Sequence, residues 1–358
     1  MIYNDVRRSS KEIKIGNVSI GAKNPIAIQS MTNTDTHDKE ATLAQIRSLE
    51  TCGCNIVRIT VPDEDAVETI TFLKNNNVNI PIVADIHFDY RIAVSCAKAG
   101  IDKIRINPGN IGDDNRVREV VNACKEYAIP IRIGVNSGSL EKEILNKYGA
   151  PTPDALCESA MYHVSLLEKF NFEDIVISIK ASDPYQMICA NKKLASLCNY
   201  PLHLGVTEAG LKDMGSVKSA IGIGSLLCDG IGDTIRVSLT DKPEEEIDAA
   251  KNILKAIGIN GQSGMNIISC PTCGRTKIDL ISLVKEFEHR AYIEGISSKP
   301  IKVAIMGCVV NGPGEAREAD IGIAGGKGEA VLIKKGIVVE KIPEENIVER
   351  LIEEIKKL

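Results

Sequence analysis

Residues 80–107 read IPIVADIHFDYRIAVSCAKAGIDKIRIN, and this stretch shows the unit from which most of the chain is built. Two apolar, β-branched runs, IPIVADIH and KIRIN, flank the segment YRIAVSCAKAG, which has the pattern of a helix and closes on Gly100. Helices commonly end at a glycine, and short β-branched runs bounded by turn residues are typical of strands. The stretch therefore predicts two parallel strands joined by a helix.

The same unit recurs along the chain. Eight apolar runs occur at intervals that leave room for a helix: PIAIQSM (25–31), CNIVRITV (54–61), IPIVADIH (80–87), KIRIN (103–107), PIRIGVN (130–136), DIVISIK (174–180), LHLGVTEAG (202–210) and DTIRVSLT (233–240). Eight parallel strands alternating with helices predict a TIM (β/α)8 barrel, an α/β fold. Ahead of them, KEIKIGNVSIG (11–21) predicts a hairpin around Gly16 and Asn17 that plugs the lower end of the barrel.

Composition limits the class of protein. With 358 residues, of which 44% are hydrophobic, the chain can bury the core of one large domain and a smaller one. No apolar run reaches the roughly 18 residues of a membrane helix, and the start MIYNDVRRSSKE lacks the apolar segment of a signal peptide. We therefore expect a soluble, cytoplasmic protein. The net charge of -5 argues against general nucleic-acid binding but allows a local basic pocket.

The eleven cysteines form an odd and dispersed set. Without a secretion signal, this favours reduced thiols in a reducing compartment over a disulfide framework. Cys52 and Cys54 form a CxC just before a strand, and we interpret them as small buried thiols rather than as metal ligands.

Polar residues close the apolar runs, and in a TIM barrel the active site lies where the strands end. Five of them are cations on five different strands, and buried cations are unfavourable unless an anion compensates them. A phosphate or diphosphate ligand would do so; the ordinary alternative is pairing with Asp85, Glu208 and Asp233. The candidate substrate-binding residues are Arg58, Asp85, His87, Arg105, Asn107, Arg132, Asn136, Lys180, Arg236 and Ser238.

Two of these closing residues allow more than one interpretation. His87 could contact a ligand or could be a satisfied core residue. Glu208, in GVTEAG, closes an otherwise apolar strand and is expected to point into the cation-rich pocket. It could transfer a proton during catalysis, or it could be a counter-ion for Lys180 or Arg236.

A second domain follows the barrel. We place the barrel in residues 1–262 and a compact α+β domain in 263–358, after an amphipathic helix in DKPEEEIDAAKNILKAIGI and the break NGQSG. The second domain is predicted to contain the strands NIIS, IKVAIMGC, DIGIAG, EAVLI and GIVVEKI, a helix in DLISLVKEFEHRAYIEG and a final helix.

This domain contains SCPTCGRT, with Cys270 and Cys273 in a CxxC turn after a strand, and Cys308 at a similar strand end. A CxxC can be a disulfide, half of a zinc site, a redox dithiol or two cluster ligands. Zinc usually takes four Cys or His ligands, and the only local histidine, His289, lies in mid-helix. A [4Fe-4S] cluster with three cysteines and a displaceable Glu315 is the favoured interpretation, ahead of zinc or an inert CxxC.

Taken together, CPTCGRT, GCVVNGPGEA, QSMTNT, ADIHF, IRINPGNIG, IGVNSGSL, ISIKAS, GVTEAG and IRVSLT resemble the 4-hydroxy-3-methylbut-2-en-1-yl diphosphate synthase family of the methylerythritol phosphate route to isoprenoids. The resemblance covers nearly the whole chain and matches the two-domain bacterial form.

What the resemblance implies is a reductive ring opening and dehydration of 2-C-methyl-D-erythritol 2,4-cyclodiphosphate. The family's cluster ligands fall on Cys270, Cys273, Cys308 and Glu315, and its proposed acid falls on Glu208. Its diphosphate contacts fall on Arg58, Arg105, Arg132, Lys180 and Ser238, with Arg236 beside them. The resemblance also implies flavodoxin or ferredoxin as the electron donor and a homodimer whose active sites are shared between chains.

Two competing functions remain open at the level of sequence. One is a barrel that binds a diphosphate ester without redox chemistry, like the pterin-diphosphate transferases, with a structural zinc. The other is a non-catalytic iron–sulfur sensor, which would have no need of a pre-formed anion pocket.

Overall fold

The computed structural model describes residues 6–259, 264–310, 314 and 316–358. The chain divides into two compact units, the first ending at Ile257 and the second beginning at Gly258. Each unit has its own sheet and its own core.

The first unit is built on eight parallel strands, as the repeated apolar runs predict. Their order in the sheet is β8-β7-β6-β5-β4-β3-β10-β9. The two ends of this sheet meet, because Ile177 in β8 bridges Leu202, and its N–H donates to the Pro201 carbonyl at 3.0 Å. The strands are β3 (Ala27–Met31), β4 (Ile56–Thr60), β5 (Ile82–Asp85), β6 (Lys103–Ile106), β7 (Ile131–Asn136), β8 (Ile175–Lys180), β9 (His203–Leu204) and β10 (Thr234–Ile235).

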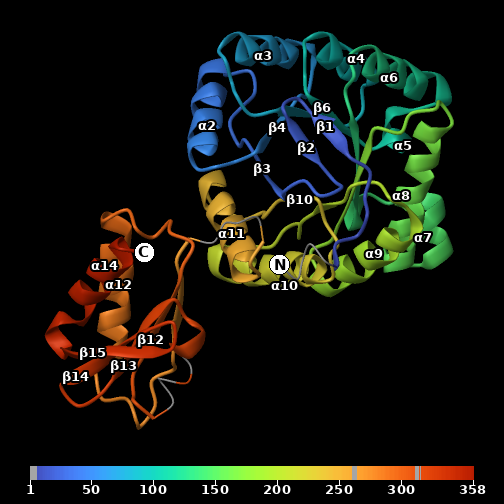
Figure 1. Ribbon diagram of the computed structural model, residues 1–358. Helices are drawn as coiled ribbons and strands as arrows, with labels where there is room; N and C mark the ends of the chain where they lie inside the picture. The colour runs from blue at the N-terminus through green and yellow to red at the C-terminus, as the bar shows by residue number, and fades with distance from the viewer. Residues whose placement is uncertain (1–5, 260–263, 311–313, 315) are drawn as a thin grey trace. The chain divides into compact units, whose positions relative to one another are not determined.

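Helices surround these strands and complete the TIM barrel, as Figure 1 shows. Several of them begin at an aspartate directly after a strand or loop, such as Asp38, Asp89 and Asp183, whose carboxylate accepts a backbone N–H of the first turn. The helices are α2 (Lys39–Thr51), α3 (Glu64–Asn75), α4 (Tyr90–Lys98), α5 (Pro108–Ile111), α6 (Asp114–Glu126), α7 (Lys142–Tyr148), α8 (Pro153–Glu168), α9 (Pro184–Leu197), α10 (Lys212–Cys228) and α11 (Pro243–Ala256), with a short 3-10 turn at Ser137–Ser139.

The predicted N-terminal hairpin closes one end of the barrel. Strands β1 (Ile13–Ile15) and β2 (Val18–Ile20) pair antiparallel around Gly16, which has the left-handed φ of 53° that suits glycine. The hairpin isoleucines pack against residues near the start of the barrel strands, namely Ala27, Ile56, Val83 and Val176. The prediction of a plug at the lower end is therefore confirmed, and the strand C-termini remain at the other end.

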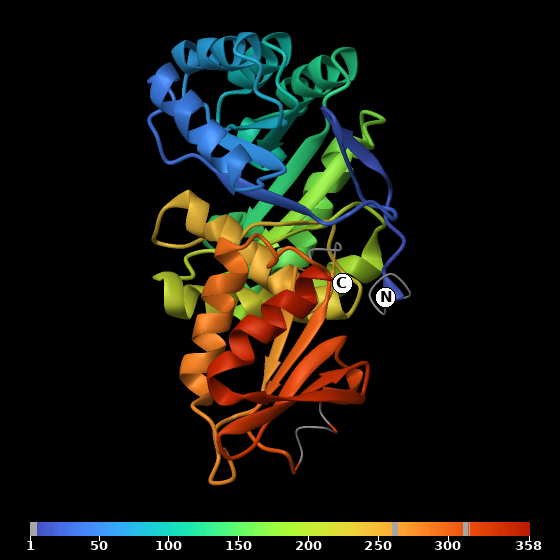
Figure 2. The ribbon, with the colours of Figure 1, turned by 60° about the vertical axis from the view of Figure 1, so that its left-hand side comes forward.

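Among the described residues of the second unit, a five-stranded mixed sheet packs against two helices. The strand order is β11-β12-β13-β14-β15. Strands β11, β12 and β13 run parallel to one another, and β14 is antiparallel to both β13 and β15. One face packs on α12 and α14 around the fully buried Phe287, and these helices lie on the same side of the sheet in Figure 2. The elements are β11 (Asn266–Ser269), α12 (Leu280–Ile293), β12 (Lys302–Met306), β13 (Ile321–Gly325), β14 (Glu329–Lys334), β15 (Ile337–Pro343) and α14 (Ile347–Lys356), with 3-10 turns at Ala316–Glu318 and Glu344–Asn346.

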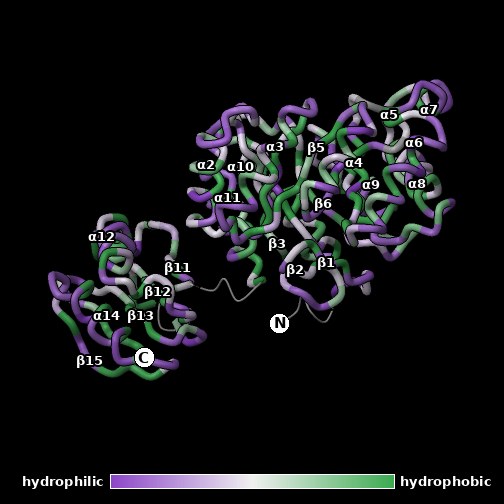
Figure 3. Tube along the Cα trace, turned by 90° about the horizontal axis from the view of Figure 1, so that it is seen from above, coloured by the Kyte–Doolittle hydropathy of each residue, from purple (hydrophilic) through white to green (hydrophobic). Residues whose placement is uncertain are grey.

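Hydrophobic residues concentrate along the strands and hydrophilic residues along the outer helices, as the contrast between β3 and α7 illustrates in Figure 3. Within the described ranges, no helix is both long enough and apolar enough to cross a lipid bilayer.

Candidate active site

A cavity of about 220 Å³ lies at the C-terminal ends of the barrel strands. It contains nine of the ten predicted substrate-binding residues, all except Asn107, together with two that the sequence analysis did not single out, Ser178 and Thr207. The lining residues are Arg58, Asp85, His87, Arg105, Arg132, Asn136, Ser178, Lys180, Thr207, Arg236 and Ser238. We call this cavity the barrel mouth.

One carboxylate, that of Asp85, holds two of the five cations. Arg105 Nη1 lies 3.0 Å from Asp85 Oδ1, and Arg58 Nε lies 3.7 Å from Oδ2. Burial acts to raise the pKa of Asp85, but the positive charges of Arg58, Arg105 and Arg132 outweigh burial and bring the pKa to about 2. Asp85 is therefore ionised at neutral pH.

A second carboxylate, that of Glu246 in α11, holds Arg236. The Arg236 Nε lies 3.4 Å from Glu246 Oε2, which also accepts a hydrogen bond from Ser30 Oγ at 3.1 Å. Glu246 is only 5% exposed, although an acid in the first turn of an amphipathic helix is usually solvated. The alternative interpretation, in which Glu208 and Asp233 pair with the strand-end cations, is therefore wrong. Arg58 and Arg105 pair with Asp85, and Arg236 pairs with Glu246.

Asp233 has a different role. Its Oδ1 lies 3.0 Å from Arg7 Nη2 and accepts a hydrogen bond from Ser10 Oγ at 2.8 Å. These partners come from the N-terminal segment, so Asp233 ties that segment to the start of β10.

Arg132 and Lys180 have no carboxylate within 4.0 Å in the described parts of the chain. Arg132 Nη1 donates to Ser178 Oγ at 2.9 Å, while its Nε and Nη2 find no partner among the described residues. Burial lowers the pKa of both Arg132 and Lys180 well below its usual range, and neighbouring cations lower it further. The mouth thus brings five cations together against the two carboxylates of Asp85 and Glu246, and it favours an anionic ligand.

Two glycines make room for these long side chains. A Cβ on Gly134 would lie 2.4 Å from Arg105 Nε, and a Cβ on Gly205 would lie 2.9 Å from Lys180 Nζ and 2.5 Å from the Arg236 carbonyl. Any larger residue would displace a cation from the mouth.

At the rim, the structure differs from the expectation for Glu208. Thr207 lines the cavity, whereas Glu208 is exposed, with a left-handed φ of 53° that is unusual for a residue other than glycine. The strand ends at Leu204, and the left-handed backbone at Glu208 turns its side chain away from the cavity. His87 lines the mouth and is exposed, and Asn107 is buried at the start of α5.

The three predicted cysteine ligands lie at strand ends of the second unit. Cys270 follows β11 and Cys308 closely follows β12, and Ser269 pairs with Ile305 in the parallel register. Cys270 Sγ accepts a hydrogen bond from the Gly307 N–H at 3.2 Å, so these two strand ends are adjacent.

Cys273 is exposed, and hydrogen bonds from the backbone and side chain of Arg275 lower its thiol pKa, with a further contribution from Thr276. A lowered pKa favours the thiolate, the form that binds metals. All eleven cysteines are free of disulfides.

Glu315, the predicted fourth ligand, lies outside the described residues. Within the described residues, no group of three or more Cys, His, Asp or Glu side chains is close enough to hold a metal ion. The donor set nevertheless fits an iron–sulfur cluster in its chemistry, since it offers thiols, an N–H donor to sulfur and a thiolate-favouring turn.

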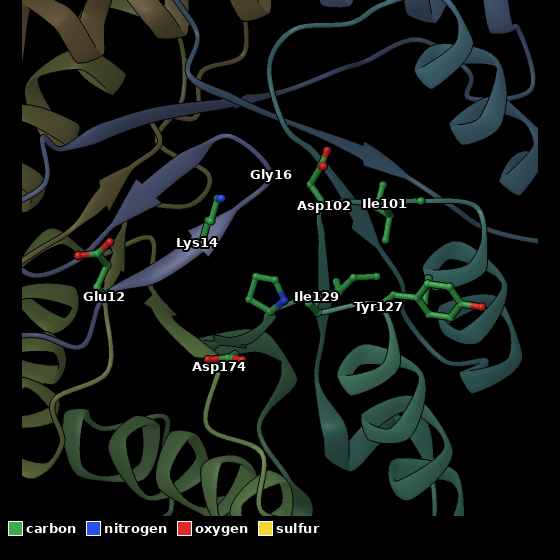
Figure 4. Close-up of a pocket in the computed structure, with 12 residues that line it drawn as sticks. Glu12, Lys14, Gly16, Ile101, Asp102, Tyr127, Ile129 and Asp174 are labelled. Carbon is green, nitrogen blue, oxygen red and sulfur yellow. The ribbon is translucent and has the colours of Figure 1, made fainter.

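A larger hollow of about 610 Å³ lies at the opposite end of the barrel, beside the hairpin. Figure 4 shows Glu12, Asp102 and Asp174 around it, with Lys14 from β1. Its mixed charges lack the excess of cations found in the mouth, so it does not compete as the anion site.

Comparisons with known proteins agree with this arrangement. Residues 10–251 match the family model described as GcpE TIM-barrel domain, and residues 266–357 match GcpE protein C-terminal domain. The 4-hydroxy-3-methylbut-2-en-1-yl diphosphate synthase (flavodoxin) of Fusobacterium nucleatum is 58% identical over 353 residues, which cover 99% of this chain and 97% of that protein. The protein of the same name from Caldanaerobacter subterraneus is 58% identical over 354 residues, covering 99% and 98%.

Among solved structures, a truncated 3-deoxy-D-arabino-heptulosonate 7-phosphate synthase from Thermotoga maritima matches with a TM-score of 0.51 and 13% identity, over 70% of this chain and 95% of that chain. At such low identity this likeness supports the barrel fold alone. Family models and close relatives cover both units, and the chain therefore belongs to the GcpE family, the family of 4-hydroxy-3-methylbut-2-en-1-yl diphosphate synthases.

Proposed function

We infer that the protein catalyses the reductive ring opening and dehydration of 2-C-methyl-D-erythritol 2,4-cyclodiphosphate to 4-hydroxy-3-methylbut-2-enyl diphosphate. The observation that carries this inference is the excess of cations in the barrel mouth, where Arg132 and Lys180 have no carboxylate partner among the described residues. A cyclic diphosphate supplies the missing negative charge. Its family relatives, named for this diphosphate product, cover nearly the whole chain.

The mouth residues bind and orient the substrate. Guanidinium groups bind phosphate oxygens in pairs, so Arg58, Arg105, Arg132 and Arg236 suit the two phosphates, with Lys180 as a further positive charge. Ser238 and Asn136 add neutral hydrogen-bonding groups at the edge. Since Asp85 and Glu246 hold three of the arginines in place beforehand, little reorganisation is needed when the substrate binds.

The second unit would hold a [4Fe-4S] cluster through Cys270, Cys273, Cys308 and Glu315. When bound, such a cluster supplies the two reducing equivalents one electron at a time, which no protein side chain can do. The Gly307 N–H at Cys270 and the Arg275 groups at Cys273 favour thiolates at these positions.

Glu208 is our candidate for the residue that protonates the departing hydroxyl, which leaves as water. Its exposed position at the rim, next to the cavity-lining Thr207, allows it to reach a group bound at the entrance of the mouth. Its strained backbone conformation supports a functional role, because such strain persists mainly where function needs it.

We propose that the protein works as a homodimer with shared active sites. Helices of a TIM barrel return the chain to the face opposite the active site, so α11 carries the chain away from the mouth of its own barrel. The second unit of a partner subunit would then close the mouth in a two-fold arrangement.

The proposed electron donor is flavodoxin or ferredoxin. The cytoplasm is the expected compartment, because eleven reduced cysteines fit a reducing environment.

Metal content separates this function from a transferase with a structural zinc. Protein purified without oxygen should be brown, contain iron and sulfide, and bleach when reduced with dithionite. Colourless protein with one zinc per chain would contradict the proposed function and favour the transferase.

A further inference from the structure

Beneath the mouth, the interior of the barrel holds three polar side chains that the proposed function does not use, and Arg132 of the mouth acts on two of them through its charge. Gln29 and Arg132 are each 1% exposed, and Lys103 and His203 are 0% exposed. We call these four residues the buried polar layer. A lysine without solvent contact inside a barrel is rare, because burial strongly disfavours the charged amine.

The strand register places this layer directly below the mouth. Lys103 lies two residues before Arg105 in β6, and His203 lies two residues before Gly205, so each points to the same side as the residue above it. Arg105 and Arg132 are partners in the β6–β7 register. His203 is likewise the partner of Thr234 and is joined to it by a hydrogen bond of 2.7 Å between Nδ1 and Oγ1.

Several atoms of the layer find no hydrogen-bond partner in the described residues. These atoms are both amide atoms of Gln29, Lys103 Nζ, Arg132 Nε and Nη2, and His203 Nε2. Buried donors and acceptors of this kind are satisfied in folded proteins by enclosed water, which polar surroundings retain. We therefore infer that the layer is hydrated, and water can carry protons between it and the mouth.

The charges that act on Lys103 and His203 in this layer are positive. The charges that act on Lys103 are those of Arg132 and Arg58, and the charges that act on His203 include those of Arg132, Lys180 and Arg58. The carboxylates of Asp85 and Glu246 are already paired with Arg58, Arg105 and Arg236.

Among the described residues, the Lys103 amine therefore has no carboxylate partner. Burial lowers the pKa of Lys103 well below its usual range, and the charges of Arg132 and Arg58 lower it further, which favours the neutral amine in the free protein.

We propose that Lys103 is a proton acceptor coupled to the anion site, so that binding a diphosphate in the mouth draws one proton from solvent onto the Lys103 amine. The bound anion offsets the repulsion of Arg132 and Arg58, and the neutral amine becomes an ammonium. This inference rests on the proposed diphosphate site. It predicts that affinity for diphosphate falls as the pH rises, by up to about tenfold per pH unit while the free amine is neutral.

Isothermal titration calorimetry of the full chain with inorganic diphosphate tests this coupling. The proton uptake is obtained at pH 8 from the binding enthalpies in two buffers that differ in ionisation enthalpy. Diphosphate itself exchanges protons on binding, and this contribution is the same for all variants. The difference in proton uptake between variants therefore measures the contribution of the protein.

We expect Lys103→Met to bind diphosphate with fewer protons taken up than the wild type. Lys103→Arg, which is cationic at all times, should also bind without the extra uptake. The matched control Lys14→Met removes a lysine from the hairpin at the opposite end of the barrel and should behave like the wild type.

Equal uptake in the wild type and both Lys103 variants would overturn the proposal. Loss of uptake in His203→Asn with normal uptake in Lys103→Met would assign the proton to His203 and also overturn it. Absence of any diphosphate binding by the wild type would instead refute the anion site itself. Thermal melting checks folding, and Lys103→Met should melt no lower than the wild type because it removes a buried, unpartnered amine.

Discussion

Arg105 Nη1 lies 3.0 Å from Asp85 Oδ1 at the mouth of the barrel, and the same carboxylate reaches Arg58 through its other oxygen. Asp85 is the only acid that lines this cavity within the described residues. The arrangement keeps two guanidinium groups ordered while leaving the mouth with an excess of positive charge.

Replacing Asp85 with Asn should lower stability and change its dependence on acid. The pKa of Asp85 is about 2 in the folded protein and 3.8 in its reference state, so its contribution is present above pH 4 and is lost as the pH falls toward 2. That contribution is worth about 2 kcal/mol in the free energy of unfolding. Urea unfolding of wild type and Asp85→Asn across this pH range measures it, and identical acid profiles would contradict the assignment.

Replacing Lys180 with Met should leave the stability of the free protein undiminished and should weaken the effect of the ligand. Lys180 is 6% exposed and has no carboxylate within 4.0 Å among the described residues, so its removal should not lower the melting temperature of the free protein. The upward shift of the melting temperature caused by inorganic diphosphate should become smaller. A large loss of stability without ligand, with the diphosphate effect retained, would show that Lys180 is structural.

Gly205, which lies close to the Lys180 side chain, should not tolerate a side chain of its own. Gly205→Ala places a Cβ 2.5 Å from the Arg236 carbonyl and 2.9 Å from Lys180 Nζ, so we expect a loss of about 1–3 kcal/mol and weaker diphosphate binding. Gly224 in α10 is the matched control, since a Cβ there meets no atom within 4 Å. Gly224→Ala should be neutral or stabilising by up to about 1 kcal/mol. If both substitutions have the same effect, the close packing at Gly205 is not what matters.

Glu208→Gln should keep substrate binding and lose most of the turnover, because the amide keeps the shape but cannot donate the carboxyl proton. Steady-state kinetics distinguish the two interpretations of Glu208. A large rise in KM with unchanged kcat would show that it only positions the ligand.

Most of the barrel could be predicted from the sequence because each strand is a short β-branched run and each helix has its own start and stop residues. Nine of the ten predicted mouth residues were found by their position at strand ends alone. Ser178 and Thr207 could have been found by alternation, since they lie two residues from Lys180 and Gly205 on the inward face.

Other features depend on contacts between distant parts of the chain. Glu246 looks like an ordinary acid in the first turn of a helix, and only the packing of α11 against β3 buries it beside Arg236. The outward turn of Glu208 follows from a left-handed backbone at a residue where the sequence predicts a continuing strand. The burial of Lys103 depends on barrel closure, which no local pattern reveals.

The most direct test of the account is product formation under strictly anaerobic conditions. The reconstituted protein is incubated with 2-C-methyl-D-erythritol 2,4-cyclodiphosphate and reduced flavodoxin, and the products are identified by mass spectrometry, with Cys273→Ser as the comparison. The wild type should form 4-hydroxy-3-methylbut-2-enyl diphosphate, and Cys273→Ser should form little or none while still binding inorganic diphosphate. Equal product from both proteins, or none from iron-loaded wild type, would contradict it.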